Sequence, residues 1–238
     1  MLVPLTTAGA VLTLTAGGYA YAAMWPTSQI FGRAIIGGDH PNEFALTYDD
    51  GPNDPYTQQL LDLLAQHQAR ATFFLIGRFV RQRPDIARAI RAAGHLVGNH
   101  TTTHPVLLFE SPKRVHQELA ECNAAIEDAL GEPVRYFRPP HGARRPDVLR
   151  AARELGLTPV LWNAMGYDWK PTTADAVLAN LQKGIRRNRR KGVGSNLLLH
   201  DGGQAGIGQD RSHSVAATAK LLKSTARQVR YVTVDAWG

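Results

Sequence analysis

The sequence has almost no capacity for thiol chemistry, because Cys122 is the single cysteine among its 238 residues. One cysteine excludes an intramolecular disulfide framework and any cysteine-rich metal site. Cys122 also falls in the apolar stripe of a predicted helix, so we expect it in the core and not at a site of nucleophilic attack. The chain therefore cannot be a small secreted domain that depends on disulfides.

Charged side chains are absent from residues 1–32, and Arg33 is the first. From Leu5 to Trp25, 14 of 21 residues are apolar, and residues 20–22 have the small-x-small pattern of a signal-peptide cleavage site. A stretch of about 20 apolar residues can span a bilayer. We therefore expect residues 1–35 to be an export signal or membrane anchor that places the protein outside the cytoplasm. An extension that packs on the domain is the alternative.

Disorder is excluded by a composition of 44% hydrophobic and 20% charged residues. No repeat, linker or low-complexity tract interrupts residues 36–238, which we expect to form one catalytic domain. The 27 basic and 20 acidic residues give a net charge of +7. This charge favours an anionic partner or solubility, but it does not indicate which reaction the protein catalyses. No recognised nucleic-acid-binding motif accompanies this charge, so nucleic acid is not expected as a partner. The oligomeric state stays open.

The densest basic run, Arg186–Lys191, is expected to follow a helix and to precede a strand. Such runs are usually solvated, and cations are favourable at a helix C-terminus. A contact with anionic wall polymer or lipid headgroups is the alternative interpretation.

Short apolar segments alternate with amphipathic segments throughout residues 44–234. Strands that alternate with helices in this way form right-handed crossovers and a parallel sheet. We therefore predict an α/β fold, a single distorted (β/α)7-type barrel with its active site at the C-terminal strand ends. An open doubly wound sheet is the alternative.

The elements expected from these patterns are delimited by caps, prolines and glycines. The predicted strands are Phe44–Thr47, Ala71–Ile76, His95–Asn99, Tyr136–Arg138, Thr158–Asn163, Asn196–His200 and Tyr231–Val234. The predicted helices run from Asn53–Pro55 through Leu64, from Pro84 to Ala93, from Ser111–Pro112 to Leu130, from Pro146 to Leu155, from Ala174 to Ile185 and from Ser212 to Arg227.

Ionisable residues follow five of these predicted strands. In β/α barrels the C-terminal ends of the strands carry function, so side chains from different strands meet on one rim. The residues expected to converge there are Asp49, Asp50, His100, His104, Arg138, Asp168 and His200.

Two of these residues have the spacing of metal ligands. His100 and His104, four residues apart, can present both imidazoles to one ion. One carboxylate of the pair Asp49–Asp50 would complete a set of two histidines and one aspartate, with positions left open for water and substrate. The adjacent carboxylate would then serve as a general base.

The remaining residues suit proton transfer. Arg138 can hold the base by a bidentate contact and keep it ionised. His200 comes from another strand and can protonate a leaving group, and Asp168 can orient His200 and raise its pKa.

Together these motifs resemble the polysaccharide deacetylase family, also called the NodB-homology domain or carbohydrate esterase family 4, from about Phe44 to Val234. Thr47–Pro52 is similar to the motif T-F/Y-D-D-G-P, and His100–His104 to H-S/T-x-x-H. Arg138–Gly142 is similar to R-x-P-x-G, Asp168–Trp169 to the end of the fourth motif, and Leu198–His200 to L-x-H.

The resemblance implies a metal-dependent hydrolase that removes N-acetyl, or alternatively O-acetyl, groups from peptidoglycan, a chitin-like polymer or another N-acetylated glycan. Zinc is the expected ion, and cobalt or another divalent metal is also compatible with the ligands. The resemblance implies that Asp50, His100 and His104 are the metal ligands. It implies that Asp49 is the general base, oriented by Arg138, and that His200 is the general acid, with Asp168 as its partner. On the substrate side, it implies that the backbone N–H of His141 donates to the oxyanion and that Trp169 and Leu198 contact the substrate.

Two positions depart from the family pattern. His141 stands where tyrosine or tryptophan is usual, and Met165 replaces the first aspartate of the fourth motif. Neither change removes a metal ligand, the base or the acid. They leave the shape of the acetyl pocket, and hence the particular glycan, undetermined.

Other functions share parts of this pattern. Two histidines and one carboxylate also form the facial triad of iron(II) oxygenases, but β/α alternation argues against their usual jelly roll. Haloacid-dehalogenase-type phosphatases need Asp-x-Asp, whereas Asp49 and Asp50 are adjacent. A non-catalytic glycan-binding relative, and an enzyme that uses the same machinery on another non-peptide amide, remain as alternatives.

Overall fold

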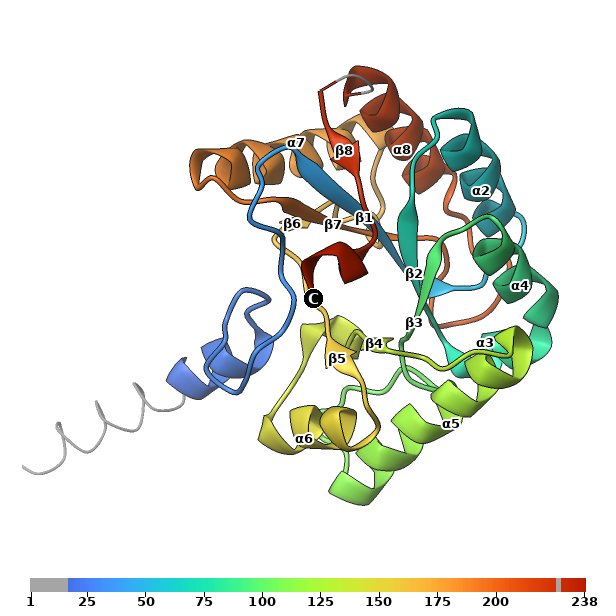
Figure 1. Ribbon diagram of the computed structural model, residues 1–238, viewed down its shortest axis with the longest axis vertical. Coiled ribbons are helices and arrows are strands. Elements are labelled where there is room, and N and C mark those ends of the chain that lie inside the picture. The colour runs from blue at the N-terminus through green and yellow to red at the C-terminus, as the bar shows by residue number, and fades with distance from the viewer. Residues whose placement is uncertain (1–16, 226–227) are drawn as a thin grey trace, which may run out of the picture.

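Parallel strands form a curled sheet at the centre of the structure, a computed structural model that describes residues 17–225 and 228–238 (Figure 1). The strands are hydrogen-bonded in the order β5-β4-β3-β2-β1-β7-β6, and β8 pairs with the first residues of β1. Their bounds are β1 Glu43–Gly51, β2 Ala71–Leu75, β3 Leu96–Asn99, β4 Tyr136–Phe137, β5 Thr158–Pro159, β6 Ala164–Met165, β7 Ser195–His200 and β8 Arg230–Tyr231. This confirms the predicted α/β barrel in a distorted form, because the described residues contain no pairing between the edge strands β5 and β6.

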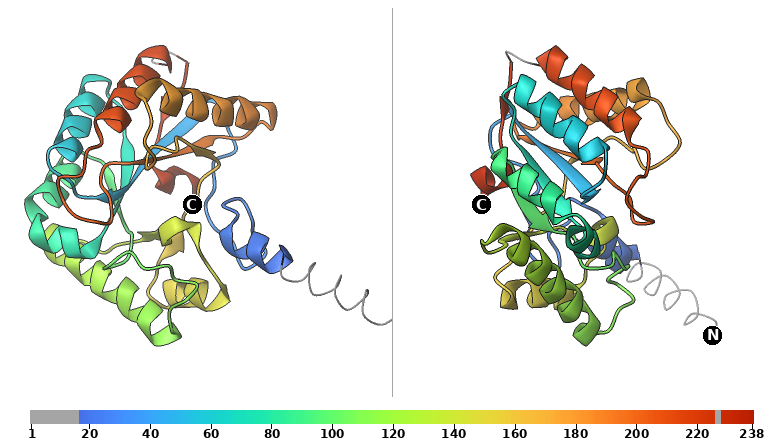
Figure 2. Two further views of the ribbon diagram at one scale, coloured as in Figure 1. Left: turned by 180° about the vertical axis from the view of Figure 1, so that it is seen from behind. Right: turned by 90° about the vertical axis from the view of Figure 1, so that its right-hand side faces the viewer.

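Helices surround the outer side of the sheet (Figures 1 and 2). Their bounds are α2 Tyr56–Gln66, α3 Gly77–Gln82, α4 Pro84–Ala92, α5 Pro112–Leu130, α6 Pro146–Glu154, α7 Ala174–Arg190 and α8 Ser212–Thr225. Helix α3 is not evident from the sequence, because its six residues are too few to display a helical stripe. The predicted last helix agrees with α8 as far as Thr225, and residues 226 and 227 lie outside the described residues.

Helix α7 is longer than its apolar pattern suggests. It continues through Arg190, so the basic run lies mostly inside the helix and does not follow it as expected. Asn188 makes this extension stable, because its buried side chain donates to Oδ1 of Asn163 at 2.7 Å and to Oγ of Ser195 at 3.1 Å. A polar residue with partners in the neighbouring strand therefore continues the inner face of the helix.

The predicted strand Thr158–Asn163 is wrong as a single element, since the chain forms β5, leaves the ladder and then forms β6. The carbonyl oxygen of Leu161 explains the interruption. It accepts the side-chain amide of Asn196 at 2.6 Å and the guanidinium of Arg138 at 3.2 Å in place of a strand partner.

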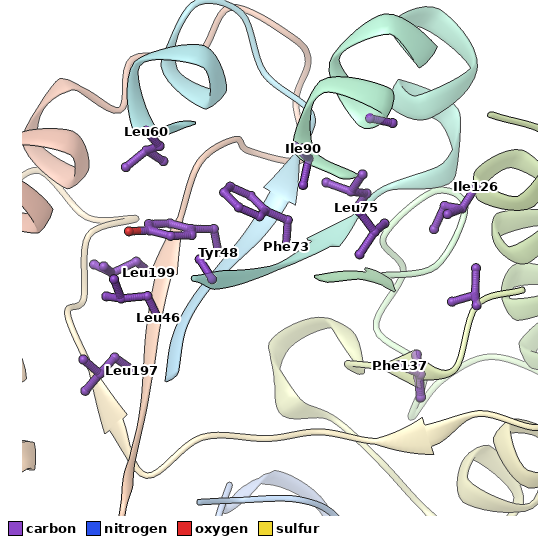
Figure 3. Packing of buried hydrophobic residues seen from close by; sticks show 14 of the residues in the cluster. Leu46, Tyr48, Leu60, Phe73, Leu75, Ile90, Ile126, Phe137, Leu197 and Leu199 are labelled. Carbon is purple, nitrogen blue, oxygen red and sulfur yellow. The ribbon is translucent and has the colours of Figure 1, made fainter. Parts of the chain in front are cut away.

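Alternation along β1 separates a dry outer face from a polar interior. Leu46 and Tyr48 point toward the helices and pack with Phe73, Leu75 and Leu199 in the main hydrophobic cluster (Figure 3). Residues two apart share a face of a strand, so Thr47 and Asp49 point to the opposite side, into the barrel. The apolar outer face thus fixes which side chains of β1 face the site.

The first described residues pack on the domain. Residues 17–24 are helical and include the predicted cleavage tripeptide, whereas residues 1–16 of the predicted N-terminal segment lie outside the described residues. Ala22 and Ala23 are buried, and the backbone N–H of Arg144 donates to the carbonyl oxygen of Ala23 at 3.0 Å. Ile35 then forms a parallel bridge with Val160 beside β5. Within the described ranges, no helix has the length and apolar character needed to cross a bilayer.

Phe73 tests the packing of the outer face. Its ring is fully buried and stacks on Tyr48 with centroids 5.0 Å apart. Phe73→Ala removes buried carbon and leaves a cavity, so we expect the free energy of unfolding in urea to fall by about 3–5 kcal/mol. Phe73→Leu, which keeps most of the volume, should lose less than about 1.5 kcal/mol. Equal stability of the alanine variant and the unmodified protein would contradict this packing.

Candidate metal-dependent active site

The ionisable residues singled out in the sequence meet at the C-terminal end of the sheet. Asp49 and Asp50 lie just before Gly51, the last residue of β1, and His100 follows β3. Arg138 follows β4, and His200 ends β7. Asp49 and His200 are register partners in the β1–β7 pairing, so their side chains leave the sheet on the same face. The two residues expected to transfer protons therefore come from adjacent strands.

A local bend in β1 aims two consecutive carboxylates at this rim. Successive strand residues normally point to opposite faces. The register with β2 shifts between Asp49 and Gly51, and Asp50 has a φ of 72°, in the left-handed region that aspartate tolerates better than most residues. The irregularity turns Asp50 back toward the side that Asp49 faces.

Asp50, His100 and His104 form a buried cluster whose ligand atoms all lie within 4.8 Å of one another. Oδ1 of Asp50 is 3.1 Å from Nε2 of His104 and 3.4 Å from Nε2 of His100. The other ring nitrogen of each histidine is engaged: Nδ1 of His100 lies 2.8 Å from the carbonyl oxygen of Arg138, and Nδ1 of His104 lies 2.7 Å from Oε1 of Gln204. These acceptors favour a proton on Nδ1, which leaves the Nε2 lone pair of the neutral ring facing the cluster.

The cluster fits a divalent cation. Oδ1 of Asp50 is buried and accepts no hydrogen bond, although two imidazoles face it. A carboxylate oxygen and two imidazole lone pairs directed at one another require a positive charge between them, and this donor set is one that transition metals accept.

Asp49 lies beside the cluster but has a different partner. Its Oδ1 accepts from Nη1 of Arg138 at 2.8 Å, and its Oδ2 is 3.7 Å from Nε2 of His100. The expected bidentate contact with Arg138 is not formed, because Nη2 of the arginine donates to the carbonyl oxygen of Leu161. Burial lowers the pKa of Arg138 and the charge of Asp49 opposes this. Asp49 and Arg138 thus form a buried ion pair beside the cluster.

His200 and Asp168 form a second buried pair. Nδ1 of His200 lies 2.8 Å from Oδ1 of Asp168, and the backbone N–H of His200 donates to Oδ2 at 2.8 Å. Burial would lower the pKa of His200, but the charge of Asp168 raises it to about 9. Burial would raise the pKa of Asp168, but the charge of His200 and the hydrogen bonds lower it. His200 is therefore suited to donate a proton near neutral pH.

The three residues expected at the substrate side have different surroundings. His141 has a left-handed φ of 59°, and its ring centroid lies 4.8 Å from that of His104. Trp169 is 42% exposed, with its ring 5.4 Å from that of His200. Leu198 is buried against Trp162 in a small apolar cluster inside the barrel.

Several contacts of the site are not evident from the sequence. Gln204 holds His104, and Ser214 donates to Oδ2 of Asp168 at 2.7 Å. Thr47 accepts from Nη1 of Arg138 at 2.8 Å. Thr47 stands two residues before Asp49, so strand alternation was a usable signal for it. Gln204 and Ser214 lie in or after a glycine-rich segment, where no periodicity indicates a direction.

Comparison with known proteins gives a consistent result. A family model described as polysaccharide deacetylase matches residues 37–160. The chitooligosaccharide deacetylase of Sinorhizobium fredii is 40% identical over 66% of this chain and 71% of its own length. The peptidoglycan-N-acetylglucosamine deacetylase of Bacillus cereus is 36% identical over 80% of this chain and 85% of its own length.

Solved structures with this fold include both a deacetylase and a pseudoenzyme. A peptidoglycan N-acetylglucosamine deacetylase with a bound benzamide matches with a TM-score of 0.75 and 30% identity, over 85% of this chain and 91% of that one. A pseudoenzyme of carbohydrate esterase family 4 from Bacillus anthracis matches with a TM-score of 0.73 and 28% identity, over 84% of this chain and 66% of that one. The fold alone therefore does not decide whether a member of the family is active. The side chains at the rim of the barrel must decide it.

Gln204 gives a test of the metal cluster that does not depend on catalysis. Gln204→Ala removes the acceptor that orients the ring of His104, so we expect zinc affinity to fall about 10- to 100-fold. Competition with a chelating dye measures this. Gln209→Ala is the control in the same loop, since Gln209 contacts Asn53 through its backbone carbonyl oxygen. Equal zinc affinity in the Gln204 and Gln209 variants would rule out the orienting contact.

Proposed function

The chain belongs to the polysaccharide deacetylase family, and on that premise we propose that it hydrolyses the acetyl groups of an N-acetylated polysaccharide or oligosaccharide. Its relatives are named for peptidoglycan N-acetylglucosamine and for chitooligosaccharide, so the proposed substrate is a glycan that contains N-acetylglucosamine. Removal of the N-acetyl group is the main reaction, and removal of an O-acetyl group is the alternative for the same residues.

The separation of two adjacent carboxylates is the observation that carries this proposal. Asp50 faces two imidazoles within 3.4 Å, whereas Asp49 is paired with Arg138. A protein that only binds glycan gains nothing from burying both carboxylates in such different surroundings. The arrangement supports a catalyst over a non-catalytic relative.

Asp50, His100 and His104 are the residues that we propose to hold a divalent cation. Zinc is the expected ion for two imidazole nitrogens and one carboxylate oxygen, and cobalt or another divalent metal also suits these donors. When bound, such an ion supplies a positive charge that polarises the acetyl carbonyl group and acidifies a water molecule.

Proton transfer is assigned to residues on either side of this cluster. Asp49, paired with Arg138, accepts a proton from the water that attacks the acetyl carbon. The bond between that carbon and the sugar nitrogen then breaks, and His200 donates a proton to the departing nitrogen. The products are acetate and a free amino sugar. No covalent intermediate forms, in agreement with the burial of Cys122 in the core.

Binding of the acetyl group is assigned to the apolar cluster inside the barrel. Leu198 and Trp162 pack there and would accept a methyl group. The backbone N–H of His141 would donate to the carbonyl oxygen as it becomes negative, an interaction worth about 3–4 kcal/mol in such sites. Trp169 offers a half-exposed ring beside His200 on which a sugar can stack.

An extracytoplasmic location follows from the proposed substrate. Peptidoglycan, the glycan named for one relative, lies outside the cytoplasmic membrane. We propose that residues 1–35 export or anchor the protein, and that residues 36–238 form the catalytic domain.

Acetate release is the direct test of the proposed function. With zinc present, we expect release from at least one member of a panel of chitooligosaccharides and peptidoglycan, and loss of activity in excess chelator. Asp49→Asn should reduce the rate about 10²- to 10⁴-fold and retain stoichiometric zinc, because it removes the base and spares the ligands. An Asp49→Asn variant as active as the unmodified protein would overturn the base assignment, and release that persists in excess chelator would overturn the metal.

The pH profile tests the acid. The protonated form of His200 is the active one, so the rate should fall as the pH rises through its pKa of about 9. Asp168→Asn removes the charge that raises this pKa, and the falling limb should move down by about 1–2 pH units. The control is Asp175→Asn, which alters an exposed carboxylate paired with Lys220 on the outer surface. A limb that does not move in Asp168→Asn would exclude His200 as the acid.

A further inference from the structure

Exposed large apolar side chains gather near the start of the described chain. Of eight such residues among the described ranges, five lie between positions 19 and 30. We call them the N-terminal aromatic cluster: Tyr19, Tyr21, Met24, Trp25 and Ile30. Trp25 is 55% exposed and its ring stacks on Tyr21 with centroids 6.0 Å apart. Exposed large apolar side chains that gather in this way usually mark a contact with another surface.

The cluster is fixed to the catalytic domain by a buried arginine. The guanidinium of Arg144 donates to the carbonyl oxygens of Trp25 at 2.8 Å, Ser28 at 2.7 Å and Gly142 at 3.0 Å. Gly142 belongs to the turn that carries His141. The cluster therefore has a fixed position relative to the active-site rim, and so does any surface that it contacts.

The chemistry of the cluster matches a membrane interface. Tyrosine and tryptophan combine an apolar ring with a polar group and concentrate at the boundary between lipid headgroups and acyl chains. No charged side chain occurs before Arg33, and residues 1–16, which precede the cluster, contain only apolar, glycine, proline and threonine residues. Because the segment that leads to the cluster carries no charged side chain, it is compatible with contact between the cluster and lipid.

A basic surface lies on the same side of the molecule. The C-terminal end of α7 and the N-terminal segment both project to the left in Figure 1 and to the right in the left panel of Figure 2. Gly194, which follows α7, donates to the carbonyl oxygen of Gly38, which follows the N-terminal segment, at 2.7 Å. The exposed cations at this end of α7 are Arg186, Arg187, Arg189, Arg190 and Lys191, and none of them forms an ion pair within residues 17–225 and 228–238. Clustered exposed cations of this kind attract anionic headgroups.

We propose that the N-terminal aromatic cluster and the basic end of α7 together form a surface that binds an anionic lipid bilayer. The aromatic cluster enters the headgroup region, and the cations of α7 contact the lipid charges. Since Arg144 joins the cluster to the turn of His141, the surface holds the catalytic rim at a constant height above the bilayer. Binding of lipid by this surface does not depend on the proposed hydrolysis.

Fluorescence quenching tests the aromatic contact in the full-length chain. Phosphatidylglycerol–phosphatidylcholine vesicles with lipids brominated near the headgroup are added, and tryptophan emission is recorded. We expect quenching in the unmodified protein that falls by at least half in Trp25→Phe. Trp237→Phe is the matched control, because Trp237 packs by the start of β1, where its indole N–H donates to Glu43 at 2.8 Å, and it should leave the quenching unchanged.

Charge dependence tests the contribution of α7. Arg186→Gln/Arg190→Gln/Lys191→Gln spares Arg187 and Arg189, which contact Asn163 and Phe44, and should weaken binding to anionic vesicles by at least tenfold. Vesicles of phosphatidylcholine alone should not distinguish the triple variant from the unmodified protein.

Three outcomes would overturn the proposal: no quenching by vesicles, quenching that persists in Trp25→Phe, or burial of Trp25 through self-association without lipid. Acetate release from a soluble chitooligosaccharide serves as the independent reference. It should be equal in the unmodified protein, Trp25→Phe and the triple variant, so a failure of the lipid surface is distinguished from a failure of the deacetylase assignment.

Discussion

The buried ion pair between Arg138 and Asp49 organises the interior of the barrel. A guanidinium that is fully removed from water is costly unless each of its groups has a partner. Arg138 meets this need at its two terminal nitrogens, which donate to Asp49, Thr47 and the carbonyl oxygen of Leu161. Its Nε has no hydrogen-bond partner among the described residues, and the guanidinium carbon lies 4.2 Å from the ring centroid of Phe74. These partners belong to β1, β2 and the segment between β5 and β6. One side chain thus fixes the relative positions of the strands that carry the site.

The same pair explains why two neighbouring aspartates differ in chemistry. Arg138 provides Asp49 with a positively charged partner at 2.8 Å. Asp50 has no arginine and faces the imidazoles of His100 and His104. Asp49 is consequently engaged by a cation of the protein itself, whereas Asp50 faces only imidazoles, as a metal ligand would. The difference arises from the surroundings, since the residue type is identical.

Much of this site was predictable from the sequence, because strand ends in a β/α barrel converge regardless of local detail. Predicting Asp49, His100, Arg138 and His200 on one rim required only the order of strands and helices and the rule that function lies at one end. The second aspartate was harder, since strict alternation would have turned Asp50 away, and only the positive φ explains its direction. The interruption at Leu161 depends on side-chain acceptors from distant strands, which periodicity does not reveal.

The bend at Asp50 has a consequence for how this site can change over time. Two consecutive carboxylates share one side only because the backbone reverses its alternation between them, so neither position can take over the task of the other after a one-residue slip. A lineage that loses one of these acids would have to regain the same residue at the same codon. Loss of one carboxylate by a single substitution, with the fold intact, is therefore easier for such a site than a stepwise shift of the two carboxylates to neighbouring positions of the strand.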